Sequence, residues 1–366
     1  MIEQQITKYF PVVLFIYHLL FAYVAWNYIL QDHGDASRYW FVGQDLSQKS
    51  WFSFFQPGTD IVKMITFPLV KYLHLPFWSG FILFSLFSFI GFYRLWKLIL
   101  MISFQSKIAF FVGIILLLLP NLHLWTSFIG KESIIFVAIV LMTEKLLDKK
   151  MTSPVFILAF LIVAIIRPHV AIVLLVSFVI AYFWKGKLTW KNKAYFGAIS
   201  TMSFLGIYYL LKKIAFIAGN PFERIAHIYD YHIKGLKKTT AYVPLDEYSL
   251  PYKIFTFYYR PLPLERSGIF YEIWSLENLT LLLLCIIVFF IIVKNFKATK
   301  CGIFDIFAIF AVLLLAFMYV YGYANYGLIA RTKIMAMPFI YVLMVKILSQ
   351  KVEIVARQDA QKETSS

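Results

Sequence analysis

Five short stretches combine ionisable side chains with glycine, proline or aromatic residues in patterns that could serve chemistry. The first runs from Asp32 to Trp40 and directly follows a long apolar segment. A carboxylate held beside apolar rings can act as a general base, so Asp35 is the candidate catalytic residue and Asp32 is the second choice. The alternative interpretation is an ordinary loop acid paired with Arg38.

Two further stretches place charges at breaks between apolar segments. A Gly-Lys-Glu sequence ends at Glu132, where a helix dipole would stabilise the carboxylate and Lys131 could bind a phosphate. An Arg-Pro-His sequence starts at Arg167 and ends at His169, where the arginine would match phosphate oxygens. The alternatives are a dipole-stabilised glutamate and a turn arginine that reaches the lipid headgroups.

The last two stretches lie late in the chain. Prolines make the segment from Arg260 to Glu265 stiff and extended, which could position either charge over a site. Arg331 follows an Asn-Tyr-Gly sequence and could anchor an anionic headgroup. The alternatives are a loop lying along the membrane and a snorkelling arginine. The candidate substrate-binding residues are therefore Arg38, Lys131, Glu132, Arg167, His169, Arg260, Glu265 and Arg331.

Composition limits the class of protein. Of 366 residues, 61% are hydrophobic and only 15% are charged, against about 25% charged in soluble domains. This excludes a soluble globular enzyme, a disordered chain and, with two cysteines, a disulfide scaffold. The net charge of +16 fits basic residues flanking membrane spans, and we expect no nucleic acid partner. No metal-binding residues are predicted, because the spacing of His227, Asp230 and His232 is a common one and no further ligand is identifiable.

The elements that must position these residues are apolar segments long enough to cross a bilayer as helices. The predicted fold is therefore an all-α, polytopic integral membrane protein with about ten transmembrane helices. We expect one transmembrane domain over 1–350 and a cytoplasmic, disordered tail over 351–366. The predicted segments are 9–30, 75–94, 108–125, 132–147, 153–166, 169–184, 195–216, 278–296, 302–321 and 333–349.

The charges flanking these segments predict the orientation. Short loops rich in lysine and arginine favour a cytoplasmic N-terminus and C-terminus, and most carboxylates then lie outside. Two long outer loops follow, at about 31–74 and 217–277. The first mixes aromatic and charged residues, which predicts amphipathic helices lying at the membrane interface. All five stretches fall on the outer side.

The layout resembles that of the GT-C glycosyltransferases, polytopic enzymes that use polyprenyl-phosphate sugars. In that family an acidic residue follows the first transmembrane helix, the place that Asp35 occupies here. The stretch from Pro120 to Glu132 is similar to the family's connection between the third and fourth helices. The sequence Asn325-Tyr326-Gly327, with Arg331 and Pro338, resembles a late motif of its bacterial members. Many members pair two adjacent acids, whereas Asp32 and Asp35 are separated by two residues.

The resemblance implies an extracytoplasmic glycosyl transfer at a bacterial inner membrane. A polyprenyl-phosphate sugar would be the donor, a glycan or lipid the acceptor, and membrane lipids the surroundings. Asp35 would deprotonate the acceptor, while Arg167, Lys131 or Arg331 would stabilise the departing phosphate. No cofactor is required, and a divalent metal at the carboxylates stays open. The alternatives are an oligosaccharide or O-antigen polymerase or ligase, and a transporter or flippase of lipid-linked glycans.

Overall fold

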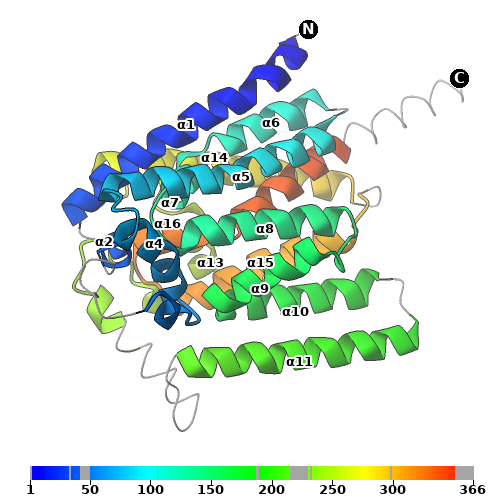
Figure 1. Cartoon of the computed structure of the whole chain (residues 1–366). Coiled ribbons are helices and arrows are strands. Elements are labelled where there is room, and N and C mark those ends of the chain that lie inside the picture. Colours follow the sequence, from blue (N-terminus) through cyan, green and yellow to red (C-terminus); the bar gives the residue numbers. More distant parts are fainter. Residues whose placement is uncertain are drawn as a thin grey trace, which may run out of the picture. The chain divides into compact units, whose positions relative to one another are not determined.

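The fold is known from a computed structural model that describes residues 2–32, 34–41, 50–104, 106–186, 189–214, 230, 233–296 and 299–350, without the side chains of 2, 32 and 210–214. Within these ranges every named element is a helix (Figure 1), and one isolated antiparallel bridge joins Tyr242 to Asn325. The predicted all-α class is therefore confirmed for the described part of the chain.

The helices follow the apolar segments, and each of the ten predicted segments is mainly helical where it is described, with turns at 118–119 and 334–336 inside two of them. The elements are α1 (Ile2–Asp32), α2 (Asp35–Trp40), η1 (Trp51–Phe54), α4 (Asp60–Lys71), α5 (Phe77–Ser103), α6 (Lys107–Leu117), α7 (Pro120–Thr126), α8 (Lys131–Leu147), α9 (Pro154–Ile166), α10 (Pro168–Lys185), α11 (Trp190–Ile214), η2 (Leu245–Glu247), α13 (Leu250–Tyr259), α14 (Ile269–Lys294), α15 (Ile303–Val320), α16 (Tyr326–Lys333) and a last helix, Met337–Gln350.

Membrane-spanning character is clearest for five described helices, which are long and apolar enough to cross a bilayer: α1, α5, α10, α14 and α15. The number rises to seven if two bent pairs, α6 with α7 and α16 with the last helix, each count as one span. The expected ten crossings are not reached on this criterion. With 13 residues, α9 extends about 20 Å, which is short of the hydrocarbon core.

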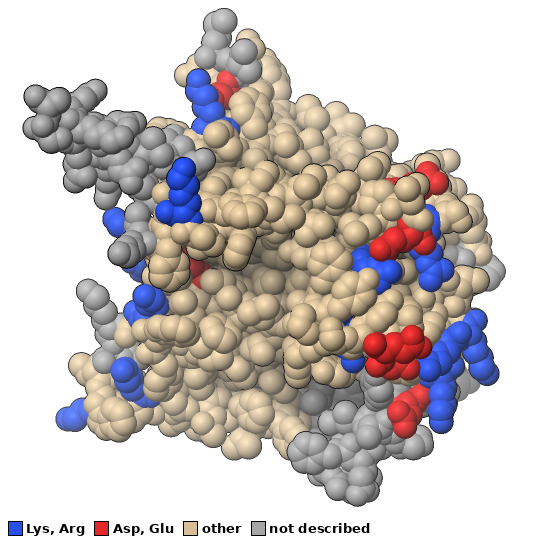
Figure 2. Space-filling model, turned by 180° about the vertical axis from the view of Figure 1, so that it is seen from behind, with Lys and Arg blue, Asp and Glu red and all other residues tan. Residues whose placement is uncertain are grey.

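Large apolar side chains remain exposed along the long helices, as expected for surfaces that face lipid. On α14, Phe289 and Phe290 are exposed, and on α1 the same holds for Leu20 and Tyr23. Figure 2 shows one face of the molecule on which uncharged residues form most of the surface. In water such a surface would drive aggregation, and in a bilayer it is solvated by acyl chains.

The chain divides into two compact units, each described here by itself. The first comprises 1–94, 121–176 and 188–227, and the second comprises 95–120, 177–187 and 228–366. The first unit therefore contains α1, α2, α4 and α8, together with α7, α9 and α11 and the first parts of α5 and α10. The second contains α6, α13 to α16, the last helix and the remaining parts of α5 and α10.

In the first unit, the short helix α2 is fixed between α4 and α5. The Trp40 indole is fully buried and its ring centre lies 6.2 Å from that of Phe77. On α4, the Thr66 hydroxyl donates a hydrogen bond to the backbone carbonyl of Tyr39 at 2.5 Å. These contacts hold α2 in place directly after the long helix α1.

Gly80 of α5 lies against the Trp40 ring, where an added Cβ would collide with the ring and with Ile129. We expect Gly80→Ala to lower the free energy of unfolding by about 1–3 kcal/mol because the overpacked side chains must shift. Denaturant unfolding of the purified protein measures this loss. Gly197→Ala on α11 is the control, since its Cβ would meet nothing within 4 Å. Equal losses in both variants would contradict the prediction.

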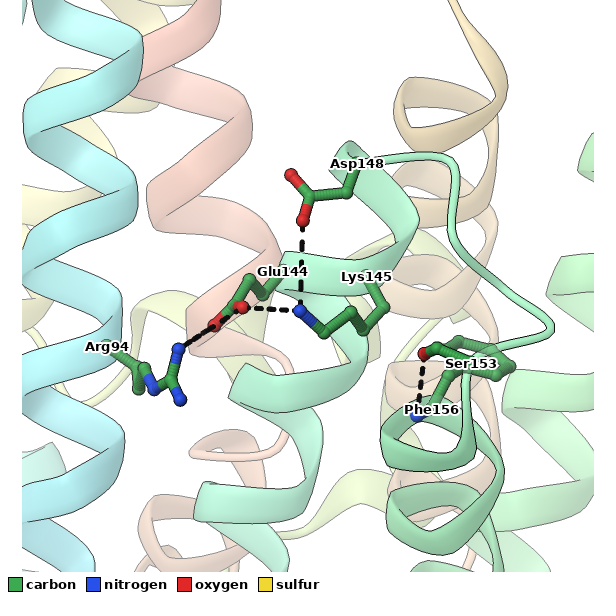
Figure 3. A network of polar contacts seen from close by, with 6 residues as sticks. All are labelled: Arg94, Glu144, Lys145, Asp148, Ser153 and Phe156. Carbon is green, nitrogen blue, oxygen red and sulfur yellow. Dashed lines mark hydrogen bonds and ion pairs between the residues drawn. The ribbon is translucent and has the colours of Figure 1, made fainter.

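At one end of α8, a polar network surrounds the turn into α9 (Figure 3). Arg94 Nη1 lies 3.3 Å from a Glu144 oxygen, and Lys145 Nζ lies 2.7 Å from Glu144 and 3.8 Å from Asp148. The Ser153 hydroxyl accepts a hydrogen bond from an amide of the first turn of α9 and caps that helix. Because α8 begins at Lys131, this network and the candidate residues Lys131 and Glu132 lie at opposite ends of the helix.

In the second unit, α16 is held at its beginning by backbone contacts. The Asn325 side chain accepts hydrogen bonds from the amides of Gly327 and Leu328 and caps the helix. The backbone of Asn325 pairs with Tyr242, and the amide of Tyr326 donates to the carbonyl of Ala241 at 3.0 Å. The segment before α13 is therefore tied to the start of α16.

Candidate functional site

The centre of the candidate site in the first unit is a buried ion pair. Arg167 donates through Nη2 to Glu132 Oε1, and both side chains are buried. Glu132 lies in the first turn of α8 and Arg167 lies one residue past the end of α9. The pair therefore joins the beginning of α8 to the end of α9, and it brings two of the predicted site residues together.

The position of Arg167 follows from the proline after it. A residue that precedes proline is driven out of the helical region, and Arg167 has φ −137° and ψ 75°. Pro168 then starts α10, where its missing amide hydrogen costs nothing. His169 follows in the first turn of α10 and is half-buried. The break predicted at this sequence is confirmed, and its arginine points to a carboxylate.

Lys131 is the first residue of α8, directly before Glu132, and is half-buried. Its ammonium donates a hydrogen bond to the Thr59 hydroxyl at 3.2 Å, just before α4 begins. The neighbouring amide of Gly58 donates to the carbonyl of Ile165, the penultimate residue of α9, at 2.8 Å. The segment that precedes α4 is therefore docked onto the beginning of α8 and the end of α9.

Asp35 is the first residue of α2 and is half-buried. Arg38, also on α2, is exposed. Asp32 lies in the last turn of α1, and its side chain is outside the described part of the structure. Because α2 packs on α4 and the residue before α4 bonds to Lys131, a single short helix connects the candidate base to the cation.

An apolar pocket of about 310 Å³ opens between α4, α5 and α8. Its residue on α8, Ile134, is one helical turn from Lys131, so the two lie on the same side of that helix. The pocket residues are Ile65, Leu69, Leu83, Phe84, Phe87 and Ile134. The site of the first unit therefore combines a cation with an adjacent apolar cavity.

In the second unit, Arg260 and Glu265 pair with each other. Arg260 Nε donates to both carboxylate oxygens of Glu265 at 2.9 Å, and its Nη1 donates to the Tyr248 hydroxyl at 3.1 Å. Burial lowers the pKa of the guanidinium, but the hydrogen bonds with Tyr248 and Glu265 outweigh this, so its pKa lies above the ordinary value. Arg260 is therefore a permanent cation with a neutralising partner.

The remaining candidate of the second unit, Arg331, lies in the last turn of α16 and is half-buried. Next to it, Lys333 is buried and donates to the side chain of Asn278 on α14, whose amide nitrogen donates to the carbonyl of Pro261 at 3.0 Å. This polar relay was not predicted. Both residues stand at the edges of apolar segments, which is the signal that could have indicated them.

A second unpredicted feature is a buried histidine pair in the first unit. The Nδ1 atoms of His18 on α1 and His123 on α7 are 3.0 Å apart, and His18 Nε2 lies 2.8 Å from the Ser88 hydroxyl. One histidine donates and the other accepts across the shared contact. The pair satisfies polar groups inside the helical core.

In the described ranges, no group of three or more His, Cys, Asp or Glu side chains lies close enough together to bind a metal ion. His227 and His232 lie outside the described residues, as does the predicted tail 351–366.

Comparison with known proteins gives no match: no family model, no curated protein and no solved structure matches this chain. The function is therefore argued from the site itself.

Proposed function

We propose that this chain is a membrane glycosyltransferase that moves a sugar from a polyprenyl-phosphate-linked donor to an extracytoplasmic glycan or lipid acceptor. The observation that carries the proposal is the arrangement in the first unit. A half-buried carboxylate on α2, Asp35, is connected through α4 to the cation Lys131. An apolar pocket lies one helical turn beyond that cation. A substrate with a charged head and an apolar tail fits this combination.

The proposed reaction breaks one bond and forms one bond. Asp35 takes the proton of an acceptor hydroxyl, and the oxygen attacks the anomeric carbon of the donor sugar. The bond from that carbon to the phosphate oxygen breaks, and the lipid phosphate leaves with the electron pair. Lys131 stabilises the charge that grows on the phosphate. The Glu132–Arg167 pair holds the ends of α8 and α9 around it.

The head of the donor would lie at Lys131 and its isoprenoid tail in the pocket between α4, α5 and α8. The Lys131 ammonium, which donates a hydrogen bond to the Thr59 hydroxyl, would supply the positive charge for the anionic head of the donor. The proposed reaction requires no metal ion, although a divalent metal at the carboxylates stays open. Chelation of divalent cations during an assay tests that choice.

Topology completes the proposal. We place the N-terminus and C-terminus in the cytoplasm, with about ten crossings or partial crossings and the site on the outer face of a bacterial inner membrane. The segments η1 and α4 would lie at the interface. This is supported by exposed Phe52 and Phe55 beside η1 and by exposed Tyr72 after α4, since aromatic rings favour the headgroup region.

Filling the pocket tests where the lipid tail binds. Leu83→Trp is expected to raise the KM for the lipid donor about tenfold, with kcat kept at saturating donor, because a misfit in an apolar site costs about 1–3 kcal/mol. Leu86→Trp is the matched control, since Leu86 is also exposed on α5 and does not line the pocket. A steady-state assay in liposomes measures both. An unchanged KM in Leu83→Trp would remove the pocket from the proposal.

The function itself is tested in cells that lack the gene. Mass spectrometry of lipid-linked saccharides and surface glycans compares deleted and complemented cells. The proposal predicts that deletion removes one sugar residue from a glycan and that the donor lipid accumulates. An unchanged glycan with lipid-linked saccharide trapped on the cytoplasmic side would favour transport instead.

A further inference from the structure

The second unit contains a compact group of planar polar side chains, here named the Arg260 cluster: Tyr248, Tyr252, Arg260 and Glu265. Besides its hydrogen bonds, the Arg260 guanidinium faces two rings. Its central carbon lies 5.7 Å from the ring centre of Tyr248 and 5.4 Å from that of Tyr252. The two tyrosine rings pack edge to face, with centres 4.7 Å apart. The cluster is therefore one connected assembly.

Part of the cluster is open to ligands. The Tyr252 side chain is 42% exposed, and the side chains of Arg260 and Glu265 keep 14% and 27% of their surfaces accessible. The exposed Tyr252 ring thus lies beside a guanidinium and a carboxylate that are only partly exposed. Proteins recognise polyhydroxylated rings with this combination, because the apolar face of the sugar stacks on the aromatic ring and its hydroxyls bond to planar groups.

Buried polar side chains hold the cluster in place. Pro261, which follows Arg260, has its carbonyl bound by Asn278, and Asn278 accepts from Lys333. Asn278 and Lys333 are only 1% and 3% exposed. Binding sites whose polar groups are fixed by such buried partners lose little entropy when the ligand arrives.

The charge of the cluster decides the class of ligand. Glu265 engages the Arg260 Nε with both carboxylate oxygens, so the positive charge is compensated at short range. A phosphate would have to displace Glu265, whose carboxylate would then lose its charged partner and keep the hydrogen bond from the Tyr326 hydroxyl at 3.4 Å. A neutral sugar adds hydrogen bonds without breaking the ion pair. The geometry therefore favours an uncharged saccharide over an anion.

We propose that the Arg260 cluster is a subsite for neutral pyranose units of the acceptor glycan. The word acceptor rests on the proposed glycosyl transfer, whereas sugar binding by the cluster can be measured without any transfer. Tyr252 supplies the stacking face, Arg260 and Glu265 bond to neighbouring hydroxyls, and Asn278 acts as a positioning residue that touches no sugar.

Saturation-transfer NMR on the full chain tests the subsite, in a detergent without a sugar headgroup. The probes are neutral trisaccharides of glucose, galactose and mannose. We expect at least one to receive saturation at its ring protons. Tyr252→Ala should weaken its binding about three- to tenfold, the worth of one aromatic contact. Asn278→Ala should weaken sugar binding as well. Glu265→Gln, which keeps the shape of the side chain, should also weaken it.

Tyr321 supplies the matched control. It is 40% exposed in the same unit and also has a cation over its ring, the Lys253 ammonium at 4.8 Å. Tyr321→Ala should leave sugar binding unchanged. The proposal is overturned if no trisaccharide binds, if Tyr321→Ala and Tyr252→Ala lose affinity equally, or if inorganic phosphate competes with the sugar.

Two further comparisons separate this proposal from the proposed function. Sugar binding lost in Tyr252→Ala, in a protein that transfers no sugar, would support the subsite and contradict the transferase. Transfer that is insensitive to Tyr252→Ala and Asn278→Ala would do the reverse. Repeating the measurement with the same trisaccharide on a lipid carrier distinguishes a free glycan, which binds through the cluster alone, from a glycolipid, which would bind more tightly and still lose affinity in Tyr252→Ala.

Discussion

Replacing Asp35 with asparagine is expected to abolish glycosyl transfer while the protein stays folded and inserted. Asparagine keeps the size of the side chain and removes its capacity to take a proton. General bases contribute about 10²–10⁴-fold to such reactions, so the rate of transfer by Asp35→Asn should be lower than that of the wild type by this factor. The measurement is transfer in cells that lack the gene, complemented at matched protein levels, with product read by mass spectrometry.

Asp60→Asn is the control for this experiment. Asp60 is also the first residue of a short helix and lies 25 residues after Asp35, but it pairs with Lys63 at 2.7 Å. Asp60→Asn should retain nearly full activity, because partly exposed pairs of this kind within one helix contribute little. If Asp35→Asn is as active as the wild type and Asp32→Asn is inactive, the base is Asp32. If both are active, a polymerase or ligase that depends on arginines is favoured.

The second large effect concerns the buried pair of Glu132 and Arg167. Removing one partner leaves an uncompensated charge in the protein interior, so Glu132→Gln or Arg167→Met should each lower the free energy of unfolding by about 3–5 kcal/mol. The double variant should be more stable than Arg167→Met alone, because no buried charge is then left without its partner. Denaturant unfolding of purified protein measures all three.

The other end of α8 provides the contrast. Glu144→Gln affects a pair with Arg94, whose side chain is largely exposed (Figure 3). Glu144 is itself 13% exposed, but its partners Arg94 and Lys145 keep 47% and 18% of their surfaces accessible. Water can therefore solvate these cations when the carboxylate is removed, and this variant should cost less than Glu132→Gln. If the loss in Glu132→Gln is no larger than that in Glu144→Gln, the pair at the candidate site is not a structural anchor.

Much of the fold could be predicted because local chemistry determines it. Apolar length marked the helices, and the proline after Arg167 marked the end of α9. The number of crossings could not be predicted in the same way. A hydropathy pattern does not distinguish a buried helix from a spanning one. With 13 residues, α9 is shorter than a bilayer requires, and α8 is not among the described helices that are long and apolar enough to cross.

The contacts of the candidate site were the least predictable part. Glu132 and Arg167 were each selected from their own surroundings, but their partnership depends on how α8 and α9 pack. Thr59, 72 residues before Lys131, carries no local signal for its contact with that lysine. The pairing of Arg260 with Glu265 is local, because two prolines fix the few residues between them.

The central claim is that this chain forms a glycosidic bond. The most direct test places the purified protein in liposomes that contain the lipid-linked saccharides accumulated by cells lacking the gene, together with their truncated glycan. We expect a product that is heavier by one sugar residue, formed by the wild type and not by Asp35→Asn. If the saccharide crosses the bilayer and no such product forms, the chain is a transporter and the proposed reaction is wrong.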